Sequence, residues 1–98
     1  MDKLRFEWNS RKNKANTNKH KISFEEAKTV FLDEKAAIAN DPDHSDNEDR
    51  YIIIGFSSSA RPLLVCFYER DKGNTIRIIS ARKLTKQEIR QFNQRWRK

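Results

Sequence analysis

The apolar residues of this chain gather in short runs that are separated by long polar stretches. Three runs, at residues 51–56, 63–68 and 76–79, are rich in β-branched and aromatic side chains, which is typical of strands buried on at least one face. Residues 4–8 alternate apolar and charged side chains, and residues 36–39 have the composition of a short edge strand. The pattern predicts three long strands, over residues 50–56, 61–68 and 75–81, and two short ones.

Two helices are predicted before the long strands. Residues 9–21 are almost wholly polar, so a helix there needs support from the rest of the fold or a cap from Asn9 or Ser10. Ser23 is followed three residues later by Glu26, which is the capping-box pattern, and apolar residues then recur on one helical face. The second helix is therefore the better defined of the two.

A third helix is predicted after the strands, because Thr85 and Glu88 repeat the capping-box pattern before a basic amphipathic segment. Residues 57–60 and 71–74 are connections short enough to imply antiparallel hairpins. The predicted fold is α+β, an antiparallel β-sheet packed with two N-terminal helices and one C-terminal helix. At this length a single domain over residues 1–98 is expected.

The charge of the chain is strongly basic and unevenly distributed. The 98 residues carry a formal net charge of +7, which raises the local concentration of anionic partners. Residues 3–22 hold seven Lys or Arg against one acid, residues 82–98 again hold seven against one, and residues 41–50 hold five acids against one arginine. Nucleic acid is therefore the first partner to consider, although a small soluble domain also needs some net charge.

Several classes of protein are excluded by the composition. Cys66 is the only cysteine, so no internal disulfide forms, and no N-terminal apolar stretch has the length of a signal peptide or membrane span. Cys66, His20 and His44 lack the paired spacing of a structural zinc site. We expect a cytoplasmic protein with no membrane association, no metal and no cofactor.

Seven short blocks, read in order over most of the chain, resemble successive motifs of the BrnT toxin family. They are Phe6-Glu7-Trp8, Lys19-His20, Ile22 to Ala27 with Val30-Phe31, Asp43-His44-Ser45 with Glu48-x-Arg50, Ile54-Gly55, Glu69-Arg70, and Ile76 to Arg82. The resemblance implies a RelE-like fold, ribonuclease activity that blocks translation, and neutralisation by a BrnA antitoxin. It further implies that BrnA is a ribbon-helix-helix protein, and that only the complex with this antitoxin contacts operator DNA.

The chain departs from the family pattern at three positions. Asn9 stands where Asp is common, Lys21 replaces a frequent Gly, and Phe92 stands where a Tyr often occurs. A phenylalanine can stack on a base but has no hydroxyl proton to donate. If that hydroxyl takes part in the chemistry, this chain is expected to be less active than its relatives.

Metal-independent RNA cleavage needs a base for the 2′-hydroxyl, positive donors for the phosphorane and an acid for the leaving 5′-oxygen. Four arginines begin, end or flank predicted strands: Arg50, Arg70, Arg77 and Arg82. Guanidinium groups suit phosphate oxygens well. Arg77 and Arg82 are an odd number of residues apart, so they point to opposite faces unless a bulge or a strand end intervenes. Each arginine can equally be the ion-pair partner of an acid such as Glu48 or Glu69.

Candidate acids and bases are fewer. His44 lies among acidic residues that favour its charged form, which makes it a candidate acid, although capping a turn would also explain it. Glu48 or Glu69 is the candidate base, and the sequence does not choose between them. His20 is a candidate phosphate ligand or a residue that orients a helix junction. Cys66 is expected to be a buried apolar residue rather than a nucleophile.

Three functions remain open from the residues alone. The first is a ribonuclease toxin, the second a non-catalytic RNA- or ribosome-binding module, and the third a structural partner of another protein. The core, rather than a platform for bases, is the expected role of six large side chains: Phe6, Trp8, Phe24, Phe31, Ile89 and Trp96. Both roles stay open for Tyr51 and Tyr68.

Overall fold

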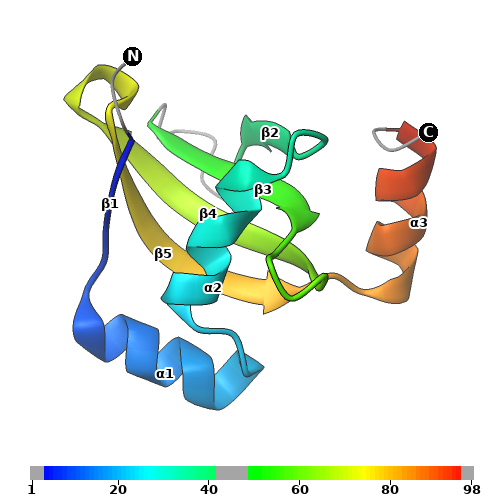
Figure 1. The fold of residues 1–98 in the computed structure, drawn as a ribbon, viewed down its shortest axis with the longest axis horizontal. Coiled ribbons are helices and arrows are strands. Elements are labelled where there is room, and N and C mark those ends of the chain that lie inside the picture. Colours follow the sequence, from blue (N-terminus) through cyan, green and yellow to red (C-terminus); the bar gives the residue numbers. More distant parts are fainter. Residues whose placement is uncertain (1–3, 42–48, 96–98) are drawn as a thin grey trace.

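The computed structural model describes residues 4–41 and 49–95. Figure 1 shows a twisted sheet with helices on one face and a third helix beyond the end of the last strand. The elements follow in the order β1 (Arg5–Glu7), α1 (Ser10–His20), α2 (Phe24–Thr29), the 3-10 turn η1 (Val30–Leu32), β2 (Ala37–Asn40), β3 (Arg50–Phe56), β4 (Pro62–Arg70), the 3-10 turn η3 (Asp71–Gly73), β5 (Thr75–Lys83) and α3 (Lys86–Arg95). In the described ranges, no helix combines the length and apolar character needed to span a membrane.

The sheet has five strands in the order β1-β5-β4-β3-β2. Strands β2 to β5 form the predicted antiparallel meander. Strand β1 joins the free edge of β5 in parallel, with Arg5 opposite Thr75, and the sheet is therefore mixed. A period-two pattern marks a strand but not its partner, so the alternation at residues 4–8 could not reveal this pairing.

The core lies between the sheet and the layer formed by α2 and η1. Phe6 packs edge-on against Phe31 at 5.2 Å between ring centroids, and Phe31 packs against Phe67 at 5.1 Å. Phe24 is fully buried and contacts Trp8 edge-on. The prediction that these aromatic residues form the core is confirmed.

Gly55 allows η1 to approach the sheet closely. A Cβ atom at this position would lie 2.9 Å from the Cβ of Ala36 and 3.0 Å from a carboxylate oxygen of Asp33. That carboxylate accepts a 2.8 Å hydrogen bond from the backbone N–H of Phe56. Any side chain at residue 55 would push this contact apart, which explains the glycine that follows three isoleucines in β3.

Side-chain caps begin both N-terminal helices. Asn9 accepts hydrogen bonds from the backbone N–H groups of Arg11 and Lys12, and Ser23 accepts one from Glu26. The capping box at Ser23 is only half formed, because the Glu26 carboxylate accepts hydrogen bonds from Arg61 instead. The charged guanidinium is a stronger donor than a backbone amide. It also lowers the pKa of Glu26 and ties α2 to the start of β4.

Candidate active site

A row of polar side chains crosses the sheet on the face opposite α2 and η1. Arg50 of β3 is paired with Tyr68 of β4, which is paired in turn with Arg77 of β5. On β3 the buried residues are Ile53 and Gly55, so Arg50 lies on the opposite face. We call the face that carries Arg50, Tyr68, Arg77 and Arg82 the arginine face.

A β-bulge brings Arg82 to this face. Phe67 is paired with Ile78 and Cys66 with Ser80, so Ile79 is an extra residue in β5. The buried positions of β5 accordingly change from Ile76 and Ile78 before the bulge to Ala81 after it. Arg77 and Arg82, an odd number of residues apart, therefore lie on the same face. The sequence left this point open, and the bulge resolves it.

The guanidinium of Arg50 is the most enclosed of the four. Its Nε lies 3.4 Å from a carboxylate oxygen of the buried Asp41, and its side chain is 18% exposed. Nη1 is 3.4 Å from the Tyr68 hydroxyl oxygen, and the guanidinium carbon lies 5.3 Å from the centre of the Tyr68 ring. An ion pair and a cation–π contact thus hold this arginine in one orientation.

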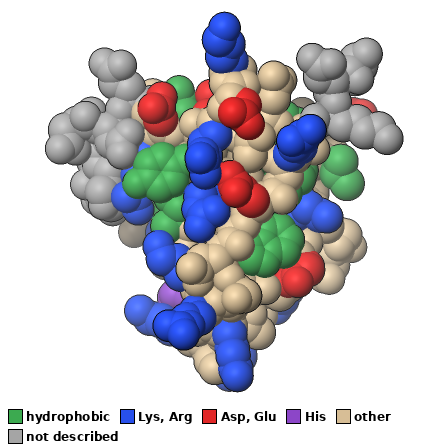
Figure 2. Space-filling model, turned by 90° about the vertical axis from the view of Figure 1, so that its left-hand side faces the viewer, with side chains coloured by type: hydrophobic (Ala, Val, Ile, Leu, Met, Phe, Trp, Pro, Cys, Tyr) green, Lys and Arg blue, Asp and Glu red, His purple; other side chains and the backbone are tan. Residues whose placement is uncertain are grey.

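Arg70 and Arg77 share one carboxylate. Arg70 Nη1 lies 3.0 Å from Oε1 of Glu7, and Arg77 Nη1 lies 3.3 Å from Oε2 of the same residue. Figure 2 views the molecule from the side where β1 lies in Figure 1, and its upper part shows basic and acidic side chains interleaved. Each guanidinium uses one nitrogen for Glu7, which leaves further N–H groups for an anion.

Arg82 is joined to the start of α3. Its Nη1 and Nη2 donate hydrogen bonds of 2.8 and 3.0 Å to the two carboxylate oxygens of Glu88. Glu88 also accepts from the backbone N–H of Thr85, whose hydroxyl accepts from the N–H of Glu88, so the predicted capping box is complete. The bond from Arg82, aided by those from Thr85, lowers the pKa of Glu88 to about 2.

The structure separates Glu69 from the arginines. The buried residues of β4, Leu63, Val65 and Phe67, have the same parity as Glu69, which places Glu69 on the core side of the sheet end. Among the residues that the structure describes, the acids that pair with the arginines are Asp41, Glu7 and Glu88, and Glu69 is not one of them. His44 and Glu48 lie outside the described residues.

Tyr68 and the paired acids Glu7, Asp41 and Glu88 were not predicted as site residues from the sequence. Strand register and packing bring them to the arginines, and no local pattern reveals these pairings. Phe92, in contrast, is 1% exposed, so its ring is enclosed within the fold.

Cys66 lies in the next row of the arginine face, paired with Ser80 and Ile52. Burial raises the pKa of its thiol, which keeps the group protonated near neutral pH. The expectation of an inert cysteine fits this setting. Within residues 4–41 and 49–95, no three His, Cys, Asp or Glu side chains gather closely enough to hold a metal ion.

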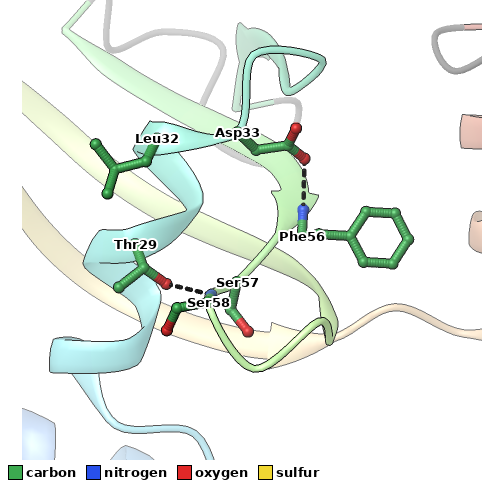
Figure 3. Close-up of a pocket in the computed structure, with 6 residues that line it drawn as sticks. All are labelled: Thr29, Leu32, Asp33, Phe56, Ser57 and Ser58. Atoms are coloured by element: carbon green, nitrogen blue, oxygen red, sulfur yellow. Dashed lines mark hydrogen bonds between the residues drawn. The ribbon is translucent and has the colours of Figure 1, made fainter.

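A pocket of about 330 Å³ lies on the other side of the sheet, between η1 and the turn that joins β3 to β4. Figure 3 shows its lining residues. The Thr29 hydroxyl accepts a 2.8 Å hydrogen bond from the backbone N–H of Ser58, and Asp33 accepts one from Phe56. Its polar groups thus brace the turn, and the arginines lie on the opposite face. We therefore place the candidate site on the arginine face.

The fold is a small mixed β-sheet with helices packed against it, and a solved structure shares it. The crystal structure of the Brucella abortus ribonuclease toxin, BrnT, is similar, with a TM-score of 0.64 and 19% sequence identity. The match covers 88% of this chain and all of that chain, and at this identity it shows the fold. No curated protein matches the chain.

Sequence comparison identifies the family. Residues 8–88 match the family described as ribonuclease toxin, BrnT, of type II toxin-antitoxin system. The match spans most of the chain, which therefore belongs to this family of ribonuclease toxins. Membership implies RNA as the substrate and an antitoxin as the partner.

Proposed function

We propose that this chain is a metal-independent endoribonuclease that cleaves messenger RNA and so inhibits translation. The observation that carries the proposal is that Arg50, Arg77 and Arg82 lie on one sheet face. Arg50 and Arg77 flank Tyr68, and Arg82 is paired with Leu64, four residues earlier in β4. The phosphorane formed during cleavage carries more negative charge than the ground-state phosphate, and preorganised guanidinium groups stabilise it selectively.

The carboxylates now paired with these arginines have a role in this scheme. In the free protein, Glu7 and Glu88 hold the guanidinium groups of Arg70, Arg77 and Arg82 in place. Phosphate oxygens then use the remaining N–H donors or displace the carboxylates. The arginine side chains of these pairs are at least one third exposed. A preset orientation reduces the entropy lost when RNA binds.

The proton transfers are assigned to the segment that precedes β3. We propose His44 as the acid for the 5′-oxygen and Glu48 as the base for the 2′-hydroxyl. Both follow Asp41, the partner of Arg50, and precede Arg50 itself in the sequence. Glu69 is the weaker candidate for the base, because it lies on the other side of the sheet from the arginines.

The proposed biological setting follows from the family. We propose a single-domain cytoplasmic toxin, residues 1–98, neutralised by a BrnA-like ribbon-helix-helix antitoxin. Operator DNA would be contacted only through that complex. A reading frame for a short ribbon-helix-helix protein next to the toxin gene would support this assignment, and its absence would count against it.

The central test measures cleavage of a single-stranded RNA by purified protein in EDTA. Wild-type protein is expected to cut, and Arg77→Gln and Arg82→Gln are each expected to reduce the rate about 100-fold. Lys35→Gln, an exposed residue away from the arginine face, is the matched control and should leave the rate unchanged. Loss of cutting in EDTA would contradict the metal-free mechanism. Salt-sensitive RNA binding without any cutting would favour a non-catalytic RNA-binding module.

A further inference from the structure

Helix α1 carries a concentration of positive charge that no acid balances. Its exposed side chains include four basic residues in an eleven-residue helix: Arg11, Lys12, Lys14 and Lys19. Among the residues that the structure describes, none of these four has an acid within ion-pair distance. The four arginines of the candidate site, in contrast, are each paired with a carboxylate.

Two of these charges lie where they weaken the helix. Arg11 and Lys12 occupy the first turn of α1, which contains no acid. The N-terminus of a helix carries partial positive charge, so cations there are unfavourable and acids are favourable. A helix selected only for stability would carry Asp or Glu at these positions. The residues therefore point to a requirement other than folding.

The helix is nevertheless held firmly. Asn16 is buried, and its side-chain amide donates hydrogen bonds to the backbone oxygens of Ile22 and Ala81 at 2.9 and 2.8 Å. Its side-chain oxygen accepts a third bond from the N–H of Ala81 at 3.2 Å. These bonds fix α1 against β5, so its basic side chains extend from a rigid base. A rigid surface loses less entropy on binding than a mobile one.

We propose that α1 binds the phosphate backbone of the RNA substrate and positions it on the toxin, apart from the arginines that act on the cleaved phosphate. The inference rests on the proposed function and extends it. Figure 2 shows basic side chains gathered at the lower end of the molecule, where α1 lies, below a region of interleaved basic and acidic side chains. Glu7 ends β1 and Asn9 caps α1, so the two regions adjoin along the chain.

The composition of the exposed face favours RNA over a protein partner. Apart from Ala15, the exposed residues of α1 are polar or charged. Protein interfaces have an apolar centre and are poor in lysine, whereas RNA backbone binding uses flexible lysine and arginine charges. The surface therefore fits a regular polyanion better than it fits a folded protein.

The test compares two quadruple variants of equal net charge. One is Arg11→Gln with Lys12→Gln, Lys14→Gln and Lys19→Gln. The control changes four exposed basic residues away from α1, namely Lys35, Lys72, Lys86 and Arg90, each to Gln. The probe is a 20-nucleotide single-stranded RNA with 2′-O-methyl riboses, which cannot be cut through the 2′-oxygen. Its Kd is measured from 50 to 300 mM salt.

The α1 variant is expected to bind the probe at least about 30-fold more weakly at 100 mM salt, and to lower the slope of log K against log salt by about 3. The control should lose less than about 3-fold. Removing Arg11 and Lys12 takes unfavourable charges from the first turn, whereas removing Lys19 takes a favourable charge from the last turn. The α1 variant should therefore melt within about 3 °C of wild type. Weaker binding with an unchanged Tm does not come from misfolding.

Four outcomes would overturn the inference. Equal losses in both variants would show a general effect of net charge. Wild-type RNA binding by the α1 variant, with loss of neutralisation by the antitoxin, would assign the surface to the protein partner. If wild type cuts RNA and the α1 variant binds and cuts RNA equally well, the α1 inference alone is wrong. Absence of both cutting and binding by wild type would remove the proposed function with it.

Discussion

Helices α1 and α3 are both short and basic and both begin after a side-chain cap, but different residues attach them to the fold. The inner face of α1 is polar, and the amide of Asn16 joins it to β5 and to the segment before α2. Helix α3 buries Phe92 and is joined to β5 by the bidentate bridge from Arg82 to Glu88.

The difference concerns how each helix uses its charges. In α3, the acid in the first turn favours the helix N-terminus and also neutralises an arginine of the candidate site. In α1, the only charged residues of the first turn are the cations Arg11 and Lys12, and stability comes from buried hydrogen bonds instead. The two ends of the chain therefore carry equal net charge in different ways. Helix α3 is joined to the candidate site, whereas helix α1 leaves its charges available.

The largest expected effect is at Asn16. Replacing it with Ala leaves the backbone groups of Ile22 and Ala81 without partners in a buried position, which is expected to lower the free energy of unfolding by about 3 kcal/mol. Urea denaturation measures the change. Asn18→Ala, on the exposed face of the same helix, should change stability by less than about 0.5 kcal/mol. Equal costs at the two positions would show that α1 is not held by Asn16.

An intermediate effect is expected from Glu88→Gln. The pKa of Glu88 is about 2 in the folded protein, below the usual value of about 4.3 in an unfolded chain. The charge therefore stabilises the fold fully above about pH 4.5, and this contribution is lost as the pH falls toward 2. Because the bridge is partly exposed, we expect the substitution to cost about 1–2 kcal/mol at pH 7.

Urea denaturation of wild type and Glu88→Gln between pH 7 and pH 2 measures this dependence. The difference between the two proteins should shrink over the same interval in which Glu88 becomes protonated. Glu34→Gln, at an exposed position, is the control and should give a small, steady difference. If the difference in unfolding free energy between wild type and Glu88→Gln is as large at pH 2 as at pH 7, the charge of Glu88 does not stabilise the fold.

The smallest effect is expected from Ser10→Glu, which gives the first turn of α1 the acid that α3 already has. The variant should be more stable than Ser10→Gln by about 0.5 kcal/mol at low salt, and the gain should shrink at high salt. Thermal melts at two salt concentrations measure it. The same variant should bind the methylated RNA probe more weakly if α1 contacts phosphate. A gain in stability that is the same at both salt concentrations would have a cause other than the charge at the N-terminus of α1.

The sequence predicted most of the local structure because caps and strands depend on near neighbours. Strand β3 begins and ends at the predicted residues, Arg50 and Phe56, and both Asn9 and Ser23 act as caps. The half-formed capping box at Glu26 could not be predicted, because Arg61 competes for that carboxylate from a position 35 residues away. Local patterns do not reveal such distant competitors.

The candidate site was predicted in its residue types but not in its pairing. The four arginines were expected, whereas their partners Glu7, Asp41 and Glu88 come from three different elements or their ends. Register and twist decide which acid meets which arginine, and these depend on the whole sheet. The parallel placement of β1 is what brings Glu7 to Arg77, its partner in register.

The extra residue in β5 gives this strand one position that tolerates a change of length. Ile79 separates a half in which even-numbered residues face the core from a half in which odd-numbered residues do. Deleting Ile79 would remove the bulge and leave regular pairing, with Ala81 still facing the core and Arg82 still on the arginine face. A one-residue shift in a regular strand, in contrast, turns every following side chain to the other face. Variation in the length of β5 is therefore expected at the bulge, and exchange of side chains elsewhere.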